Sequence, residues 1–392
     1  MISLKSICLS CGFIILIGLL VACSKSESNF SQLPGFKQYF AEHEPSGELP
    51  TAAEQALLDK YKPRVFLAKG QTPFINFYKD YIAHGALYVN KKLVSKTVTP
   101  NLLNKYRDNV TAEFRYSSFN KVSNKQKSTP IVYARIQRDE LIHQNQKLPL
   151  TFLSYNLVFA NSGLVKGLAS WQRLAMGLVA SNTDWHQLDH YVGLTIVLLD
   201  KKPIAVMLQQ HNYQTTWLLT DKNTEHTVQL PQDNRIEVDV AMQSNELYLH
   251  SPELSKHPGV SFVTKDSIEF LKTRKNKPTM AGWDITHGEI EQDYTLDFLP
   301  TADAFYTFIG KLGVSRKLPG RDGPPGANYV TLPPLMPWAN RLVSAYRPRS
   351  VLIEKEKIKD LINESEFSIM LEGLEAYKRD FLKDLRLYNQ SQ

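Results

Sequence analysis

The sequence predicts an α+β fold in which an antiparallel β-sandwich or meander forms the core and helices flank it. Apolar, β-branched runs recur through the middle of the chain, and several of them are joined by links of only a few residues. Segments with apolar residues at helical spacing lie before and after these runs. The hydrophobic fraction of 43% and the charged fraction of 22% are typical of a globular protein.

The N-terminus is typical of an export signal. Lys5 supplies a positive charge, and the run from Ile7 to Ala22 is almost wholly apolar. This run is shorter than the roughly 20 residues that cross a bilayer as a helix. We therefore favour a cleaved signal peptide at residues 1–22 over an uncleaved membrane anchor.

The end of this run, residues 20–23 (LVAC), resembles the lipobox of bacterial lipoproteins. In that family the cysteine thiol receives a diacylglycerol, cleavage occurs before the cysteine, and the new amino group is acylated. The resemblance makes Cys23 the lipid attachment site, and several acyl chains hold a protein firmly to a membrane. Ser24 follows, as in enterobacterial lipoproteins that are sorted to the outer membrane. We expect residues 23–50 to form a lipidated tether and linker.

The cysteine count and the charge exclude several kinds of function. Cys8 and Cys11 would leave with the signal, and lipid would occupy Cys23, so the mature chain would have no free thiol. Thiol catalysis, iron–sulfur clusters and cysteine-ligated zinc are then excluded. The formal charge of +7 is spread over short clusters, which indicates a solvated surface, with contact to anionic lipid or lipopolysaccharide as the alternative. Nucleic acid is not an expected partner of an exported lipoprotein.

The first part of the globular region begins with a helix and continues in strands. Thr51 and Glu54 have the spacing of a capping box, which predicts a helix over Thr51–Asp59. We expect strands at Arg64–Ala68, Pro130–Gln137 and Leu150–Ala160 because these runs are rich in β-branched and aromatic residues.

A helix is predicted next, where apolar residues recur at helical spacing. The stripe consists of Leu164, Leu168, Trp171, Ala175 and Leu178. A helix that turns this stripe toward the core is the first interpretation, and a membrane-contact helix is the alternative.

A meander of hairpins follows this helix. Three apolar runs lie between Tyr191 and Leu219 and are joined by links too short for a crossover, so we expect three consecutive antiparallel strands. Two more strands are expected at Arg235–Met242 and Glu246–His250. Short helices are expected at Ser267–Lys275 and Thr301–Leu312.

The C-terminal part is predicted to pack on the β-rich domain. Residues 318–338 are rich in proline, and we expect them to form an ordered loop or a lid. Further on, one apolar stripe at helical spacing predicts a C-terminal helix; it consists of Leu374, Tyr377, Phe381, Leu385 and Tyr388. We therefore divide the chain into a β-rich globular domain at residues 51–350 and a helical segment at residues 351–392.

The centre of the chain carries a group of histidines and aspartates, in residues 184–191 (DWHQLDHY). His186 and His190 have the spacing of the two histidines in HExxH, but Gln187 stands where that motif needs glutamate, which argues against a zincin site. If the stretch begins a strand, His186 and His190 share one face. The chain contains no GxSxG elbow, P-loop or GxGxxG motif.

Residues 185–213 (WHQLDHYVGLTIVLLDKKPIAVMLQQHNY) resemble the core of NPP1-type necrosis-inducing proteins and of the related Vps62-like domain. His186 and Asp189 take the positions of a histidine and an aspartate in the family's GHRHDWE-type stretch, and His211 takes that of a later histidine. Residues 235–252 (RIEVDVAMQSNELYLHSP) resemble the family's next strand and its Ser-His-Ala-x-Tyr turn. There Ser244 and Tyr248 match, and Asn245 takes the histidine position.

The resemblance implies a divalent metal ion, which NPP1-type proteins hold around this stretch. The candidate polar site is then His186, Asp189, His190 and His211, with His186, Asp189 and His211 as metal ligands. Tyr191 stands where the family has a carboxylate, and two histidines with one aspartate suit Zn²⁺ or Mn²⁺ better than Ca²⁺ or Mg²⁺. The alternative is that these side chains are hydrogen-bonded residues at a strand end. A working site requires Asp189 and His211 to lie within about 10 Å of each other.

Two functions follow from these observations. The first is an outer-membrane-anchored bacterial lipoprotein with a binding or structural role in the cell envelope, on its periplasmic side; we favour such a role over an enzymatic one. The second is an envelope-associated hydrolase or lectin-like effector of NPP1 or Vps62 type, which uses His186, Asp189 and His211.

Overall fold

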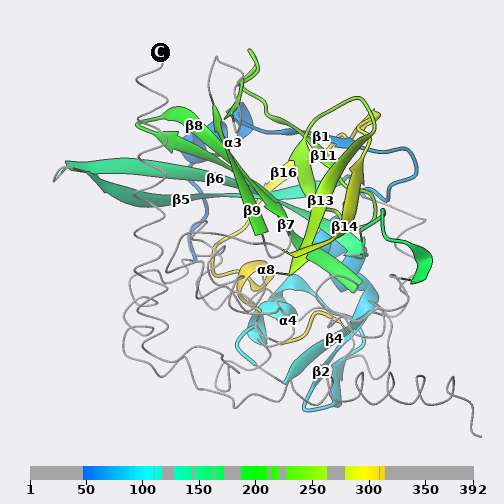
Figure 1. Cartoon of the computed structure of the whole chain (residues 1–392). Helices are drawn as coiled ribbons and strands as arrows, with labels where there is room; N and C mark the ends of the chain where they lie inside the picture. The colour runs from blue at the N-terminus through cyan, green and yellow to red at the C-terminus, as the bar shows by residue number, and fades with distance from the viewer. Residues whose placement is uncertain are drawn as a thin grey trace, which may run out of the picture.

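The computed structural model describes residues 47–109, 111–116, 128–143, 146–161, 163, 165–171, 187–210, 213–219, 227–262, 279–308 and 310–313. They form an α+β fold with a β-rich core of several, largely antiparallel sheets, which confirms the predicted class (Figure 1). Cys23, the predicted helix at Ser267–Lys275, the proline-rich residues 318–338 and the C-terminal helical segment lie outside the described residues. None of the described helices is long and apolar enough to cross a membrane.

The largest sheet has seven strands in the order β10-β9-β8-β7-β6-β5-β16. Neighbours from β5 to β9 follow one another in sequence and pair antiparallel, whereas β10 and β16 pair parallel at the two edges. The strands are β5 (Ile131–His143), β6 (Gln146–Asn161), β7 (Gln187–Leu199), β8 (Lys202–Gln210), β9 (Tyr213–Leu219), β10 (Thr227–Val228) and β16 (Thr295–Phe298).

The meander predicted between Tyr191 and Leu219 is confirmed. Leu194 pairs with Leu208, and Leu208 pairs in turn with Thr215. Asp200 and Lys201 join β7 to β8 with φ angles of 45° and 67°, the backbone that a tight two-residue hairpin loop requires.

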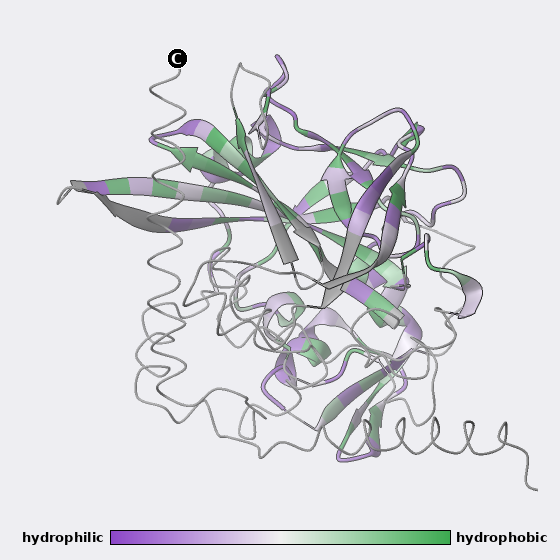
Figure 2. Ribbon diagram, viewed as in Figure 1, coloured by the Kyte–Doolittle hydropathy of each residue, from purple (hydrophilic) through white to green (hydrophobic). Residues whose placement is uncertain are grey.

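The middle of this sheet is buried on both faces, which explains why β6 is a nearly continuous apolar run. Leu153, Tyr155 and Leu157 belong to one hydrophobic cluster, and Val158 and Ala160 belong to another on the opposite face. In Figure 2 the middle of β6 is largely hydrophobic and its outer end is hydrophilic.

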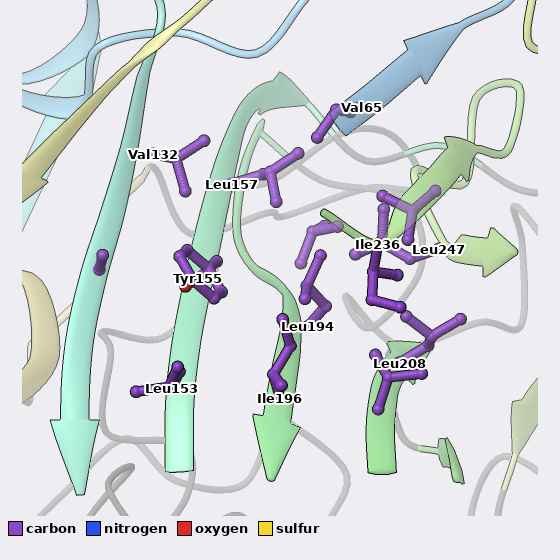
Figure 3. Close-up of a cluster of buried hydrophobic side chains, with 14 of the residues drawn as sticks. Val65, Val132, Leu153, Tyr155, Leu157, Leu194, Ile196, Leu208, Ile236 and Leu247 are labelled. Atoms are coloured by element: carbon purple, nitrogen blue, oxygen red, sulfur yellow. The ribbon is translucent and has the colours of Figure 1, made fainter. Parts of the chain in front are cut away.

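A four-stranded sheet covers the first face, in the order β12-β11-β1-β15. Its strands are β1 (Arg64–Leu67), β11 (Glu237–Val240), β12 (Leu247–Leu249) and β15 (Ile290–Glu291). Val65 and Leu247 point into the space above Tyr155 and Leu194, and these side chains share one core (Figure 3). The two sheets together form the sandwich-like part of the fold.

Helical turns and a small sheet cover part of the second face, in the lower half of Figure 1. The elements are η2 (Phe77–Tyr81), η3 (Ile82–His84), β2 (Gly85–Val89), β3 (Lys92–Ser95), α4 (Pro100–Lys105), β4 (Ala112–Tyr116) and α8 (Ala304–Thr307). Aromatic rings fill the contact: Phe305 lies edge-on to Phe77 with centroids 5.1 Å apart, and its centroid is 4.4 Å from that of Tyr133.

Two of the predicted helices can be compared with the described residues in this part of the fold. The capping box is present, and α3 (Ala52–Lys60) follows it. The helix expected over Thr301–Leu312 is restricted to Ala304–Thr307, because Phe308 turns to an extended backbone and the chain continues to a bridge between Lys311 and β4.

Of the predicted helix around Leu164–Leu178, the structure describes only residues 165–171. Val165 and Leu168 are buried, but the side chain of Trp171 is 72% exposed. The expectation that Trp171 faces the core is therefore wrong, since this side chain lies at the surface.

A two-stranded hairpin, β13 (Ser255–Phe262) and β14 (Thr279–Thr286), was not predicted. Its sequence contains Pro258, which removes a backbone donor, and mixes polar and apolar residues without clear alternation. Proline is tolerated here because β13 is an edge strand. The hairpin lies against the four-stranded sheet, on the side away from the hydrophobic core.

Candidate functional site

Of the four residues predicted for the central site, the structure describes the side chain of Asp189 alone. His186 and His211 lie outside the described residues, and the backbone of His190 is described within β7 without its side chain. The predicted approach of Asp189 and His211 therefore stays a prediction. Among the described residues, no group of three or more His, Cys, Asp and Glu side chains is placed to hold a metal ion.

Asp189 lies near the start of β7, as predicted, and is fully buried. It pairs with Phe159 on the neighbouring strand β6, next to a bulge in the pairing of the two strands. Its Oδ2 accepts a hydrogen bond of 3.2 Å from the side-chain amide of Asn245, and the same amide donates to the carbonyl of Asn161 at 2.8 Å. Asn245 thus ties the end of β6 to the start of β7.

Asn245 is held in place by the turn between β11 and β12, residues 241–246. The amide of Ala241 donates to the carbonyl of Glu246, and the amide of Asn245 donates to the carbonyl of Ala241. Gln243 and Asn245 have φ angles of 73° and 63°, in the left-handed region that asparagine tolerates better than most residues.

Neighbouring segments fix this turn from outside. The side chain of Gln71 donates to Asn245 Oδ1 at 3.0 Å and accepts from the amide of Gln243 at 3.2 Å. The amide of Gly163 donates to the carbonyl of Gln243 at 2.8 Å. The position of the Asn245 amide opposite Asp189 is therefore determined by three separate parts of the chain.

A layer of polar side chains fills the contact between this turn, the outer face of the four-stranded sheet and the β13–β14 hairpin. We call it the polar layer; it consists of Asp239, Ser244, Glu246, Tyr248, His250, His257, Asp284 and Thr286. Asp239, Asp284 and Thr286 are fully buried. Burial on this scale requires hydrogen-bond partners, because an unpaired polar group is costly inside a protein.

Asp284 lies at the centre of the polar layer. Ser244 Oγ donates to its Oδ1, and the hydroxyl of Tyr248 lies 2.9 Å from its Oδ2 and 3.1 Å from Glu246 Oε2. Burial raises the pKa of Asp284 well above its ordinary value, and the neighbouring carboxyl of Glu246 raises it further. Two carboxyl groups enclosed in this way favour a state in which one of them holds a proton.

His257 completes this side of the polar layer. Its ring stacks on that of Tyr248 with centroids 3.9 Å apart, and its Nε2 lies 3.1 Å from Thr286 Oγ1. Burial lowers the pKa of His257, which favours the neutral ring. Burial also raises the pKa of Tyr248, so its hydroxyl keeps its proton and remains able to donate.

A second pair within the polar layer joins Asp239 and His250. Asp239 Oδ1 lies 2.7 Å from His250 Nδ1, and Oδ2 accepts a hydrogen bond of 2.9 Å from the amide of Ser251. The ring of His250 stacks on Phe66 at 3.8 Å. Burial raises the pKa of Asp239, and the hydrogen bond with His250 partly opposes that rise.

Gly288 closes over this pair at a distance that excludes a side chain. A Cβ atom at position 288 would lie 2.1 Å from Asp239 Oδ1 and 2.7 Å from His250 Nδ1. The imidazole is thus oriented by a buried carboxylate, an arrangement that can hold a histidine in one tautomer.

The sequence singled out some of these residues but predicted none of their contacts. The resemblance pointed to Asp189, Ser244, Asn245 and Tyr248. In the structure Asp189 accepts a hydrogen bond from Asn245, and Asp284 accepts hydrogen bonds from both Ser244 and Tyr248. The carboxylates and histidines at 239, 246, 250, 257 and 284 were missed. Alternation of Glu237 and Asp239 with Val238 and Val240 marks a polar face on β11, but no local pattern marks Asp284.

No family model, curated protein or solved structure matches this chain. The relation to NPP1-type and Vps62-like domains therefore stays a hypothesis that rests on the sequence.

Proposed function

We propose that this chain is a lipid-anchored protein of the bacterial cell envelope, held at the outer membrane through Cys23, with a binding or structural role. The observation that carries the proposal is the sequence around the anchor: a positive charge at Lys5, a short apolar run and residues 20–23 (LVAC). Cleavage before Cys23 would leave residues 23–50 as a lipidated tether and linker to the β-rich domain.

The surroundings of Asp189 support a binding or structural role over catalysis at the predicted centre. Its carboxylate is fully buried and accepts from the amide of Asn245, which also holds the carbonyl of Asn161. A carboxylate enclosed by such partners contributes to the junction of two strands, and reaching a substrate would require that junction to open.

Metabolic labelling with palmitate tests the anchor, combined with separation of inner and outer membranes. We expect the wild-type chain to be labelled and to reside in the outer membrane, whereas Cys23→Ala is unlabelled because no thiol remains at the lipobox. Cys11→Ala is the matched control, since it removes a cysteine from the signal peptide and should leave labelling unchanged. Ser24→Asp should keep the label and move the chain to the inner membrane.

Palmitate incorporation into Cys23→Ala at the wild-type level would contradict the proposal. A labelled wild-type chain in the inner membrane would contradict only its outer-membrane location.

A further inference from the structure

On the described part of the β13–β14 hairpin, polar side chains are buried on the inner face, and the outer face carries an exposed tryptophan and an exposed proline beside Lys256. Asp284 and Thr286 on β14 face the polar layer and are fully buried, and His257 stands opposite Asp284. On the other face, Trp283 is 42% exposed and pairs with Pro258, which is also exposed. Hairpins on the surface of water-soluble domains normally show the reverse pattern.

A neighbouring segment carries a second exposed tryptophan. The amide of Gly167 donates to the carbonyl of Trp283 at 2.9 Å, and a Cβ atom at position 167 would lie 2.7 Å from Trp283 Cβ. Four residues later comes Trp171, the most exposed large hydrophobic side chain among the described residues at 72%. The two tryptophans thus belong to segments in direct contact.

The hairpin and the neighbouring segment also expose one leucine and two lysines, with the acidic Glu253 beside the leucine. Leu254 is 58% exposed and directly precedes β13. Lys256 stands opposite Ile285 on the outer face, and Lys166 is exposed on the neighbouring segment. Tryptophan is the side chain enriched at the boundary between lipid tails and headgroups, and lysine near such a boundary is attracted to anionic lipid.

We propose that the exposed side chains of Trp171, Trp283, Leu254, Lys166 and Lys256 form one face, and that this face rests on the surface of the anionic phospholipid bilayer to which the chain is anchored. The inference depends on the proposed lipid anchor. Residues 24–46 can span up to about 80 Å when fully extended, so the anchor does not determine which face of the domain meets the membrane. A second, weak contact would determine it, and the anchor raises the effective concentration at which that contact forms.

Quenching of tryptophan fluorescence by brominated lipid tests the contact. The lipidated chain is reconstituted into vesicles of phosphatidylcholine and phosphatidylglycerol that carry bromine on the acyl chains close to the headgroup. The test variant is Trp171→Phe/Trp283→Phe, and the matched control is Trp217→Phe, because Trp217 packs against the hydrophobic core from β9. We expect the quenched intensity to fall at least twofold in the test variant and to stay unchanged in the control.

Flotation of the same samples separates the two hypotheses. Chains that float with the vesicles but keep the full quenched intensity in the double variant, or show no quenching, would overturn the membrane contact and leave the anchor intact. A second copy of the chain or a protein partner would then be the occupant of this face. If the wild-type chain does not float, the anchor is contradicted. Quenching measured in the mixture before flotation then tests the membrane contact independently of the anchor.

Discussion

The two faces of the four-stranded sheet are both buried, but they are buried by different chemistry. The inner face places Val65, Val238 and Leu247 in the hydrophobic core. The outer face places Asp239 and Tyr248 in the polar layer beneath the β13–β14 hairpin. The first contact is non-directional and depends on apolar area and packing, whereas the second depends on each donor meeting its acceptor.

The same strands can therefore contribute apolar packing on one side and a pH-sensitive contact on the other. Apolar packing does not titrate, so changes on the inner face should cost the same at every pH. Carboxyls and imidazoles with displaced pKa values titrate differently in the folded and unfolded chain, so changes on the outer face should depend on pH.

The largest effect is expected on the inner face. Leu247→Ala should lower the free energy of unfolding by about 2–5 kcal/mol, because Leu247 is fully buried and its removal leaves a cavity. Leu49→Ala is the matched control, since Leu49 is exposed, and should change the free energy by less than about 0.5 kcal/mol. Urea unfolding at pH 5 and pH 8 measures both, and we expect the same loss at the two pH values. A loss for Leu247→Ala as small as that of the control would show that this face is not a packed core.

A smaller effect is expected where the polar layer is tightest. Gly288→Ala places a methyl group against Asp239 and His250, and should lower the free energy of unfolding by about 1–3 kcal/mol by forcing this buried pair apart. Gly47→Ala is the control, because no atom lies within 4 Å of a Cβ at position 47. Thermal or urea unfolding of the two variants compares them, and equal stability of both would contradict the close approach of Gly288.

Local features of the fold could be predicted from the sequence, and long-range ones could not. The capping box of Thr51 and Glu54 acts over three residues, so the start of α3 was predicted correctly. The meander from β7 to β9 was predicted because its links are short. The β13–β14 hairpin was missed because Pro258 and Gly259 interrupt the β pattern, and its partner strands are joined through residues 263–278.

The candidate site likewise contains local features that could be predicted from the sequence and long-range contacts that could not. The position of Asp189 at the start of a central strand could be predicted from the apolar run that follows it in the sequence. Its hydrogen bond with Asn245 joins residues 56 positions apart and depends on how the turn at 241–246 is held by Gln71 and Gly163. The polar face of β11 would be assigned to solvent from its alternation, but Asp239 on that face is fully buried beside His250.

A weaker effect is expected at Asp284, where it takes the form of a slope of the free energy of unfolding against pH. The pKa of Asp284 is raised in the folded chain, so the folded state binds this proton more tightly than the unfolded state. The corresponding stability is present below the ordinary carboxyl pKa of about 4 and is lost as the pH rises through the raised pKa. Asp284→Asn keeps an oxygen that accepts from Ser244 but never ionises.

The free energy of unfolding of Asp284→Asn, taken relative to wild type, should therefore increase between pH 5 and pH 8, by an amount on the order of 1 kcal/mol. Urea unfolding across this range measures it, and Asp293→Asn at the exposed surface is the control, with the slope of the wild type. Parallel pH profiles for Asp284→Asn and the wild type would show that Asp284 binds its proton no more tightly in the folded chain than in the unfolded one. The pH dependence of the outer face would then have to come from Asp239 and His257, whose pKa values are also displaced by burial.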